Sequence, residues 1–215
     1  SHELRGPLMA ISSKLEVALK YPEGIREDDR EVFSSIASAT TQMTKLTEDL
    51  LLLARSNGQQ IQMRKPIQLS QLLTHLITLY ESQAQANMIA INHEIALDLT
   101  LWGDADQITR VLTNLIQNAL QYTPEGGEVR VRAKAISSHI HITVQDTGIG
   151  IAPEYLPKVF ERFWRADAAR SHDRGGSGLG LAIAQAIVQH HGGIITVTSE
   201  VNKGSCFKVQ LPLQE

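Results

Sequence analysis

Apolar residues recur at alternating spacings of three and four in two stretches near the start of the chain. The first stretch carries them at Leu4, Leu8, Ile11, Leu15 and Ala18, and the second at Val32, Ile36, Ala39, Met43, Leu46, Leu50 and Leu53. This period predicts two amphipathic helices. The segment Tyr-Pro-Glu-Gly at 21–24 breaks the pattern and predicts a turn between them.

A two-helix hairpin leaves half of each apolar stripe in water. Two chains that join their hairpins into a four-helix bundle would cover both stripes, so the pattern favours a homodimer. Packing of the hairpin on the rest of the same chain is the alternative. A helix stop at 56–58 (Ser-Asn-Gly) and polar residues after it predict a hairpin domain over 1–57 and a linker over 58–66.

The remaining segment, 67–215, mixes helical and alternating periods and forms the second predicted domain. The pattern predicts helices at 69–86, 104–121 and 179–191, and strands at 89–97, 100–102, 128–135, 139–145, 194–199 and 205–211. Runs of helix and of hairpin strands, without a βαβ alternation, predict an α+β sandwich with its helices on one face.

Composition excludes several classes of protein. The chain has 215 residues, 42% of them hydrophobic, and a net charge of −3, which fits a globular protein and argues against nucleic-acid binding. Its single cysteine, Cys206, permits no disulfide within the chain and favours a reducing compartment. No apolar run approaches eighteen residues, and no signal peptide is evident. Because the sequence opens without methionine, we expect a fragment of a longer protein.

Two asparagines are the first candidates for chemistry. Asn114 and Asn118 lie one turn apart on one face of the predicted helix 104–121, among apolar neighbours, so both are expected to be buried. Buried carboxamides need partners, and a pair of satisfied core asparagines, or of exposed helix residues, is one interpretation. A carboxamide oxygen is also a neutral ligand for Mg²⁺ where phosphates supply other ligands.

Two glycine-containing segments are the next candidates. Asp146-Thr147-Gly148-Ile149-Gly150 ends a predicted strand, where glycines admit a flat ligand and the carboxylate can accept a hydrogen bond from an exocyclic amine. A plain turn is the alternative. The glycine-rich segment 175–181 runs into a helix, whose N-terminal N–H groups suit phosphate. Its spacing matches neither the dinucleotide fingerprint nor the P-loop, and a structural loop remains the alternative.

His2 is the candidate nucleophile. It falls outside the apolar stripe of the first helix, next to Glu3. Near pH 7 an unperturbed imidazole is mostly neutral and nucleophilic, whereas a serine would need an activating base.

Taken together, these motifs resemble those of the sensor histidine kinases, in order and spacing, over essentially the whole chain. Residues 1–8 resemble the H box, 114–119 the N box, 146–150 and 175–180 the two glycine boxes, and 159–164 the F box between them. The resemblance implies a dimerisation and phosphoacceptor hairpin followed by an ATP-binding domain. That domain would have the Bergerat fold shared with gyrase and mismatch-repair ATPases.

The resemblance also implies roles for individual residues. His2 would accept the phosphoryl group, and Glu3 would orient or deprotonate it. Asp146 would bind the adenine amino group, and Asn118 would ligate Mg²⁺. The residues implied to bind ATP are Asn114, Asn118, Gln121, Tyr122, Asp146, Gly148, Gly150, Phe160, Arg162, Gly176, Ser177, Gly178, Leu179 and Gly180. Of these, Asn114 would support the phosphates, Tyr122 would pack near the adenine, Gly148 and Gly150 would admit the base, and 160–180 would form a lid.

The function implied is autophosphorylation of His2 from Mg-ATP, followed by transfer to an aspartate on the receiver domain of a response regulator. The parent protein would be a homodimer anchored in the membrane through missing upstream segments, with this portion in the cytoplasm. Two positions depart from the family. Gln121 stands where lysine is common, which weakens one phosphate contact.

Gly6 is the second departure, because the family usually has threonine or asparagine there. In the family that side chain is thought to position the water that attacks the partner's phosphoaspartate. Its loss predicts weak phosphatase activity. Alternatively, Gly6 only eases the bend that Pro7 imposes on the helix.

Two other functions are compatible with the same fold. An ATPase of the same fold would place a glutamate one turn before the metal asparagine to activate water, and here that place is Asn114. A degenerate kinase that only scaffolds would not need the intact Asn118, Asp146 and glycines. Both are poorer interpretations than kinase activity.

Overall fold

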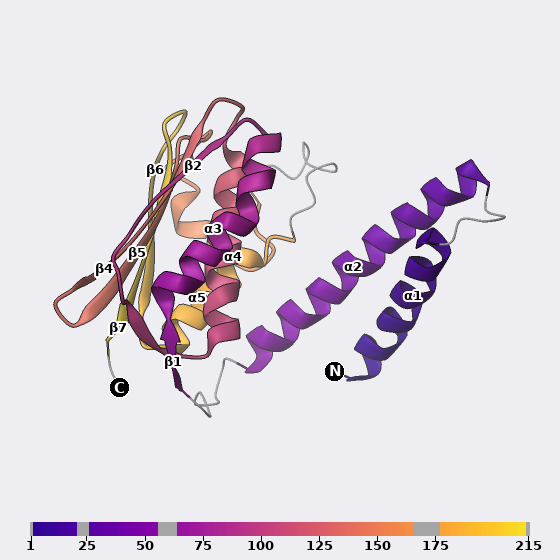
Figure 1. The fold of residues 1–215 in the computed structure, drawn as a ribbon, viewed down its shortest axis with the longest axis horizontal. Coiled ribbons are helices and arrows are strands. Elements are labelled where there is room, and N and C mark those ends of the chain that lie inside the picture. Colours follow the sequence, from indigo (N-terminus) through magenta and orange to yellow (C-terminus); the bar gives the residue numbers. More distant parts are fainter. Residues whose placement is uncertain (1, 21–25, 56–63, 166–176, 214–215) are drawn as a thin grey trace. The chain divides into compact units, whose positions relative to one another are not determined.

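The chain divides into two compact units, Ser1–Asn57 and Gly58–Glu215. A computed structural model of the protein describes residues 2–20, 26–55, 64–165 and 177–213 (Figure 1). Each unit has its own secondary structure.

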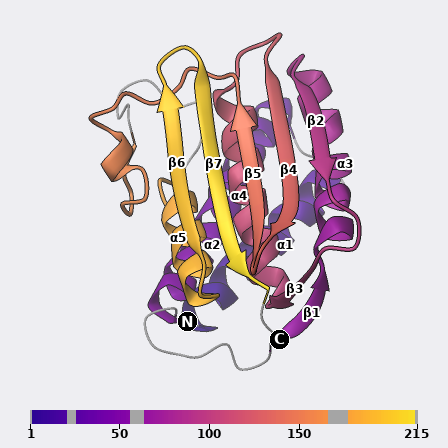
Figure 2. The ribbon, with the colours of Figure 1, turned by 90° about the vertical axis from the view of Figure 1, so that its left-hand side faces the viewer.

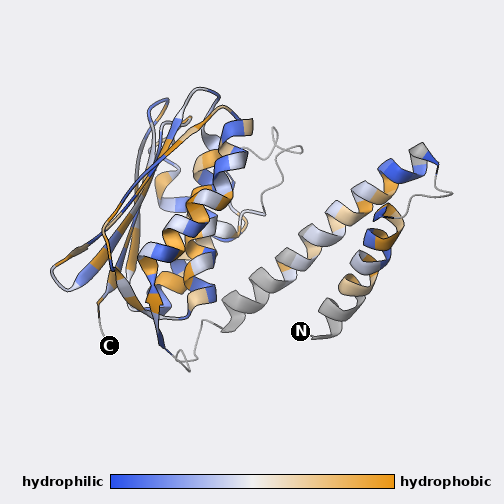
Figure 3. Cartoon of the chain, in the orientation of Figure 1, coloured by the Kyte–Doolittle hydropathy of each residue, from blue (hydrophilic) through white to orange (hydrophobic). Residues whose placement is uncertain are grey.

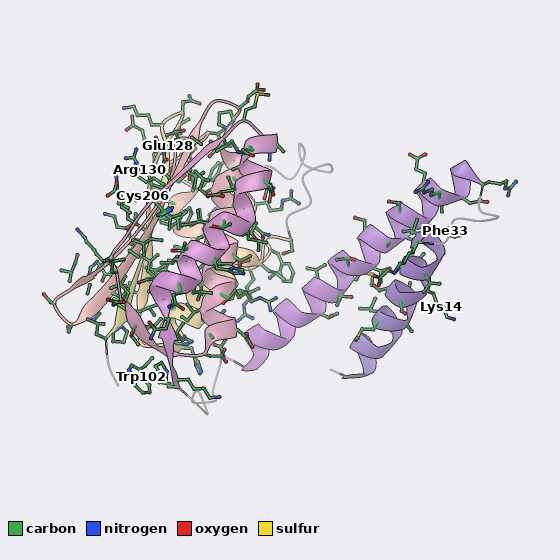
Figure 4. All side chains as sticks on the ribbon, in the orientation of Figure 1. Lys14, Phe33, Trp102, Glu128, Arg130 and Cys206 are labelled. Atoms are coloured by element: carbon green, nitrogen blue, oxygen red, sulfur yellow. The ribbon has the colours of Figure 1, made fainter. Side chains whose placement is uncertain are left out.

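The first unit is a helical hairpin, as the heptad-like pattern predicted. It consists of α1 (His2–Lys20) and α2 (Glu27–Arg55). Leu15 and Thr40 are its buried residues within the described part, and the Thr40 hydroxyl donates to the carbonyl of Ile36 at 2.7 Å. Phe33 of α2 is half-buried and, with Lys14 of α1, is labelled in Figure 4.

Much of the predicted apolar stripe of α2 lies outside this packed face. Val32, Ile36 and Met43 are 55%, 42% and 55% exposed in the single chain. On α1, Ile11 is likewise 44% exposed. The hairpin therefore keeps an uncovered apolar face on its own.

The second unit is a sandwich of one sheet and one layer of helices. The strand order is β2-β4-β5-β7-β6, with the helices on one face (Figures 1 and 2). Its elements are β1 (Lys65–Gln68), α3 (Leu69–Ala86), β2 (Ala90–Ile95), β3 (Thr100–Gly103), α4 (Ala105–Tyr122), β4 (Glu128–Ile136), β5 (His139–Asp146), the short 3₁₀ helix η1 (Leu156–Lys158), α5 (Gly180–His190), β6 (Ile194–Glu200) and β7 (Gly204–Pro212). The predicted sandwich is confirmed.

The strand pairing differs from a simple series of hairpins. β4–β5, β5–β7 and β6–β7 are antiparallel, but β2 pairs with β4 in parallel, Ala90 opposite Glu128. Parallel pairing needs a crossover, which α4 supplies between the two strands. A second, two-stranded sheet joins β1 to β3 and begins at Lys65, inside the segment predicted as linker. A strand this short, with Pro66 at an edge, gives no periodic signal.

Apolar side chains fill the space between the sheet and the helices. Strands and helices both show mixed apolar and polar positions in Figure 3, as expected of elements with one buried face. The largest fully buried side chains are Leu69, Leu73, Ile77, Leu101, Ile108, Leu112, Leu115, Ile116, Ile140, Ile142, Leu179 and Ile183.

The ends of α4 and α5 are fixed by side-chain hydrogen bonds. Asp104 caps α4 by accepting from the backbone N–H groups of Asp106 and Gln107 at 3.0 and 3.1 Å. His191, after α5, donates from Nδ1 to the Ile187 carbonyl at 2.8 Å and accepts at Nε2 from the Asp104 N–H at 3.2 Å. None of the helices in the described ranges has the length and apolar content to cross a bilayer.

Candidate functional site

Asp146, the last residue of β5, has a buried carboxylate in which one of the two oxygens accepts hydrogen bonds from described residues. Its side chain is only 5% exposed. Oδ1 accepts from the backbone N–H groups of Gly148 and Ser205, at 2.8 and 3.1 Å. Oδ2 accepts from no residue in the described part of the chain. Burial raises the pKa of Asp146, and the two backbone hydrogen bonds partly oppose that rise.

The first glycine box is packed against protein backbone. A Cβ on Gly148 would collide with the Tyr122 carbonyl oxygen, and one on Gly150, whose φ is +71°, with the Glu200 carbonyl oxygen. The glycines were predicted to admit the adenine base. In the structure their nearest neighbours are α4 and the β6–β7 turn, so the requirement for glycine already follows from this packing.

Backbone hydrogen bonds hold the box on both sides. The Ile149 N–H donates to the Tyr122 carbonyl at 3.1 Å, and the Ile149 carbonyl accepts from the Asn202 N–H at 2.8 Å. The end of α4 is thereby joined to the loop that follows Asp146. The Tyr122 side chain remains 43% exposed there, and Gln121 is half-buried.

The two asparagines of α4 have different surroundings. Both are half-buried, which lies between the buried and the exposed interpretation, and Asn114 contacts the start of α5. Asn114 donates from Nδ2 to the Gly180 carbonyl at 2.9 Å, which leaves its Oδ1 as the free atom. Asn118 makes no hydrogen bond to any described residue. An unpartnered, half-buried carboxamide oxygen fits a metal ligand.

The F box and the second glycine box are joined at their backbones. The Phe163 N–H donates to the Gly178 carbonyl at 3.0 Å, and a Cβ on Gly178 would lie 2.8 Å from the Phe163 carbonyl carbon. Both residues have positive φ, 63° and 69°. Phe160 packs edge-on against Phe207 of the core with ring centroids 6.4 Å apart, and Arg162 is exposed. The contact holds the two flanks of the predicted lid together.

The second glycine box leads directly into the first turn of α5. Ser177 accepts from the Leu179 N–H at 3.3 Å. The Leu179 side chain is fully buried, so only its backbone is left for a ligand. No side chain of the described residues caps the first turn of α5, which begins at Gly180, and uncapped N–H groups suit an anion. Gly175 and Gly176 lie outside the described residues.

The predicted H box lies in α1, where His2, Glu3 and Gly6 have helical backbone. The side chains of His2 and Glu3 lie outside the described part. Residues 2 and 6 are one helical turn apart and share a face.

The sequence patterns missed two serines of this site. Ser205 of β7 supplies one of the N–H groups that bind Asp146, and Ser199 of β6 contacts Ser205 at 2.9 Å between hydroxyl oxygens. Ser205 alternates with the buried Phe207, so a polar residue at an inward position was the available signal.

Comparison with known proteins places this geometry in a class. Residues 103–215 match the family of histidine kinase-, DNA gyrase B- and HSP90-like ATPases. Residues 1–59 match the His Kinase A phospho-acceptor domain. The second unit is thus an ATPase domain of that class, preceded by a phosphoacceptor hairpin. A chain with this pair of domains belongs to the sensor histidine kinases, which are protein-histidine kinases.

Known relatives match almost the whole chain. Sensor histidine kinase RppB of Synechocystis sp. is 36% identical over 99% of this chain and 47% of its own length. Phosphate regulon sensor protein PhoR of Pseudomonas aeruginosa is 36% identical over 96% of this chain and 47% of its own. The crystal structure of full-length ShkA in complex with AMPPNP is 28% identical, with a TM-score of 0.82 over 98% of this chain and 44% of that one. The chain therefore spans less than half the length of these relatives.

Proposed function

We propose that this chain uses Mg-ATP to phosphorylate its own His2 and then passes the phosphoryl group to an aspartate on the receiver domain of a response regulator. The observation that carries the proposal is the buried Asp146 carboxylate, one oxygen of which has no partner among the described residues, in a chain that also has a phosphoacceptor hairpin. The AMPPNP in the ShkA structure supports a nucleotide in the matching domain.

Asp146 is the proposed adenine contact. Its Oδ2 accepts from the exocyclic amine, while Oδ1 stays bound to the two backbone N–H groups that hold the carboxylate in place. The exposed Tyr122 ring packs beside the base, next to the glycine box that its own carbonyl holds.

Asn118 is the proposed magnesium ligand, because its carboxamide is unpartnered among the described residues and lies one turn from Asn114. Bound Mg²⁺ neutralises charge on the phosphates. Asn114, held by Gly180, and the uncapped start of α5 bind the phosphate end. Gln121 offers a neutral hydrogen bond where a lysine would add charge.

His2 is the proposed nucleophile. A neutral imidazole nitrogen attacks the γ-phosphorus, so that a P–N bond forms as the bond to the β–γ bridging oxygen breaks and ADP leaves. The proton on the other ring nitrogen is lost. The adjacent Glu3 accepts this proton or orients the imidazole. An aspartate carboxylate of the regulator then attacks the same phosphorus, so that a P–O bond forms as the P–N bond breaks, and the imidazole of His2 takes up a proton again.

Hydrolysis is the competing fate of ATP. A base for water is needed near the γ-phosphate, and an amide cannot serve as one. Asn114 stands one turn before Asn118 in that place, with its nitrogen bound to the Gly180 carbonyl. The arrangement favours transfer to histidine over transfer to water.

A homodimer is the proposed state of the chain. The exposed apolar residues of α1 and α2, among them Ile11, Val32 and Met43, support it because a second hairpin would cover them. We place this portion in the cytoplasm, where ATP and the regulator are available, in a parent protein anchored in the membrane by segments outside this sequence.

Gly6 makes the proposed enzyme a weak phosphatase toward its regulator. Residue 6 is one turn from His2 on the same face of α1, and glycine has no side chain to hold an attacking water. Phosphoryl transfer depends strongly on such alignment.

Incubation with γ-labelled ATP separates the candidate functions. A kinase puts the label on protein, an ATPase releases labelled phosphate, and a scaffold does neither. We expect label on the protein, and release of phosphate without labelled protein would contradict the proposal.

A further inference from the structure

The Ser199 hydroxyl lies where β6, β7 and the residue that follows the first glycine box meet. It accepts from the Ile151 N–H at 2.8 Å, donates to the Gly204 carbonyl at 2.8 Å, and lies 2.9 Å from the Ser205 hydroxyl oxygen. Ser199 and Ser205 stand opposite each other in the β6–β7 register. One half-buried hydroxyl therefore joins three segments.

These contacts use the whole hydrogen-bonding capacity of the Ser199 hydroxyl. A hydroxyl has one proton to donate and two lone pairs to accept. The proton goes to the Gly204 carbonyl, which can only accept, and the Ile151 N–H takes one lone pair. The Ser205 hydroxyl must then donate to the second lone pair. Because the Ser205 hydroxyl donates its only proton to Ser199, any further partner of its oxygen has to be a donor.

Ser205 stands directly beside the proposed adenine contact. Its backbone N–H donates to Asp146 Oδ1 at 3.1 Å, and the two residues are 8% and 5% exposed. An ionised carboxylate only accepts, so Asp146 Oδ2 and the Ser205 oxygen together offer acceptors and no donor. An exocyclic amine satisfies such acceptors. A base without an amine, or with a carbonyl there, leaves a buried acceptor unpaired, which weakens binding.

We propose that Ser199 is a positioning residue of the nucleotide pocket. Its hydroxyl ties the first glycine box to the β6–β7 turn and turns the Ser205 proton away from Asp146, which selects a base that carries an amino group. Ser199 acts through Ser205 and the backbone and does not touch the nucleotide. This inference rests on the proposed ATP-binding function of the same site.

The test compares two nucleotides that differ only in the amino group. Dissociation constants for the Mg²⁺ complexes of ATP and of purine riboside triphosphate are measured by calorimetry on the whole chain. We expect the wild type to prefer ATP by about tenfold or more, and Ser199→Ala to reduce that ratio to about threefold or less. Ser199→Thr, which keeps the hydroxyl, restores the ratio. Thr198→Val, an exposed neighbour on the outer face of β6, leaves it unchanged.

An equal loss of affinity for both nucleotides in Ser199→Ala, with their ratio preserved, would overturn the inference, since Ser199 would then only support the fold. If that variant does not fold, Ser205→Ala takes its place, and it has to reduce the same ratio. An unchanged ratio in Ser205→Ala overturns the inference as well. A wild-type chain that binds neither nucleotide contradicts the proposed ATP-binding function instead.

Discussion

At the scale of single residues, the site depends on polar groups that are held but not fully used. Asp146 has one oxygen fixed by two N–H groups and one left over. Asn114 is fixed through its nitrogen, and Asn118 is left without a partner in the described ranges. The motifs proposed these residues as candidates, but they could not predict how each side chain is held, because that depends on backbone groups from other segments. Ser199 and Ser205 were missed for the same reason.

Asn118→Asp tests the proposed metal and phosphate contact. The change keeps the size of the side chain but places a negative charge beside the phosphates. We therefore expect the affinity for Mg-ATP to fall by about a hundredfold or more. Calorimetric titration with Mg-ATP measures the effect, and Asn87→Asp, on the exposed residue after α3, is the matched control. Equal affinities in the two variants would show that the pocket lies elsewhere.

Gly6→Thr tests the proposed loss of phosphatase activity. A threonine one turn from His2 can hydrogen-bond a water, so we expect decay of a phosphorylated receiver domain to speed up by about tenfold, with autophosphorylation little altered. Gly6→Ala is the control, since it restores helix propensity by about 1 kcal/mol without a hydroxyl. Decay that is equally fast with glycine, alanine and threonine would refute the role of this position.

At the scale of elements, the helices and strands follow the sequence closely because each has one buried face. The alternation over 139–145 appears as β5, and the helical period over 104–121 as α4 with its Asp104 cap. The parallel pairing of β2 with β4 could not be predicted, because local period identifies a strand but not its partner. β1 was missed because four residues with Pro66 carry too little pattern.

His191 makes the stability of the second unit depend on pH. Burial lowers its pKa below the usual value near 6.5, although its bond to the Ile187 carbonyl and the nearby Asp104 oppose that. Below pH 6.5 the His191 side chain binds a proton in the unfolded chain, whereas in the folded chain it stays neutral to a lower pH. The free energy of unfolding should therefore be level above pH 6.5 and fall below it, by up to about 1.4 kcal/mol per pH unit.

Denaturant unfolding followed by tryptophan fluorescence measures this, because Trp102 (Figure 4) and Trp164, the two tryptophans of the chain, both lie in the second unit. His191→Gln removes the titrating group and should flatten the dependence between pH 6.5 and 5.5. If wild type and variant lose stability in parallel over that range, the assignment to His191 is wrong.

At the scale of the whole molecule, a phosphoacceptor hairpin and an ATPase domain stand in one chain. The described part of the hairpin has two buried residues and keeps an uncovered apolar face, whereas the described part of the second unit has a large buried core of its own. This contrast supports association through the hairpin. The family could be predicted from the sequence because five motifs in order constrain far more than any one of them.

Met43→Glu tests that association. Met43 is 55% exposed in the single chain, so the folding of the hairpin itself should change little, while a charge in a dimer interface should shift the chain to monomer. Sedimentation equilibrium measures the dissociation constant, which we expect to rise by about a hundredfold or more. Ser38→Glu, on an exposed position of the same helix, is the control. The same dissociation constant in both variants would contradict a dimer through this face.

The most direct measurement is the chemical identity of the labelled residue after incubation with γ-labelled ATP. A phosphohistidine has an acid-labile P–N bond, so the account predicts protein label that is lost in acid and kept in alkali. His2→Gln should abolish that label and leave the affinity for Mg-ATP unchanged, because the hairpin and the ATPase domain do separate work. Label that survives in His2→Gln, or that resists acid, would contradict the account.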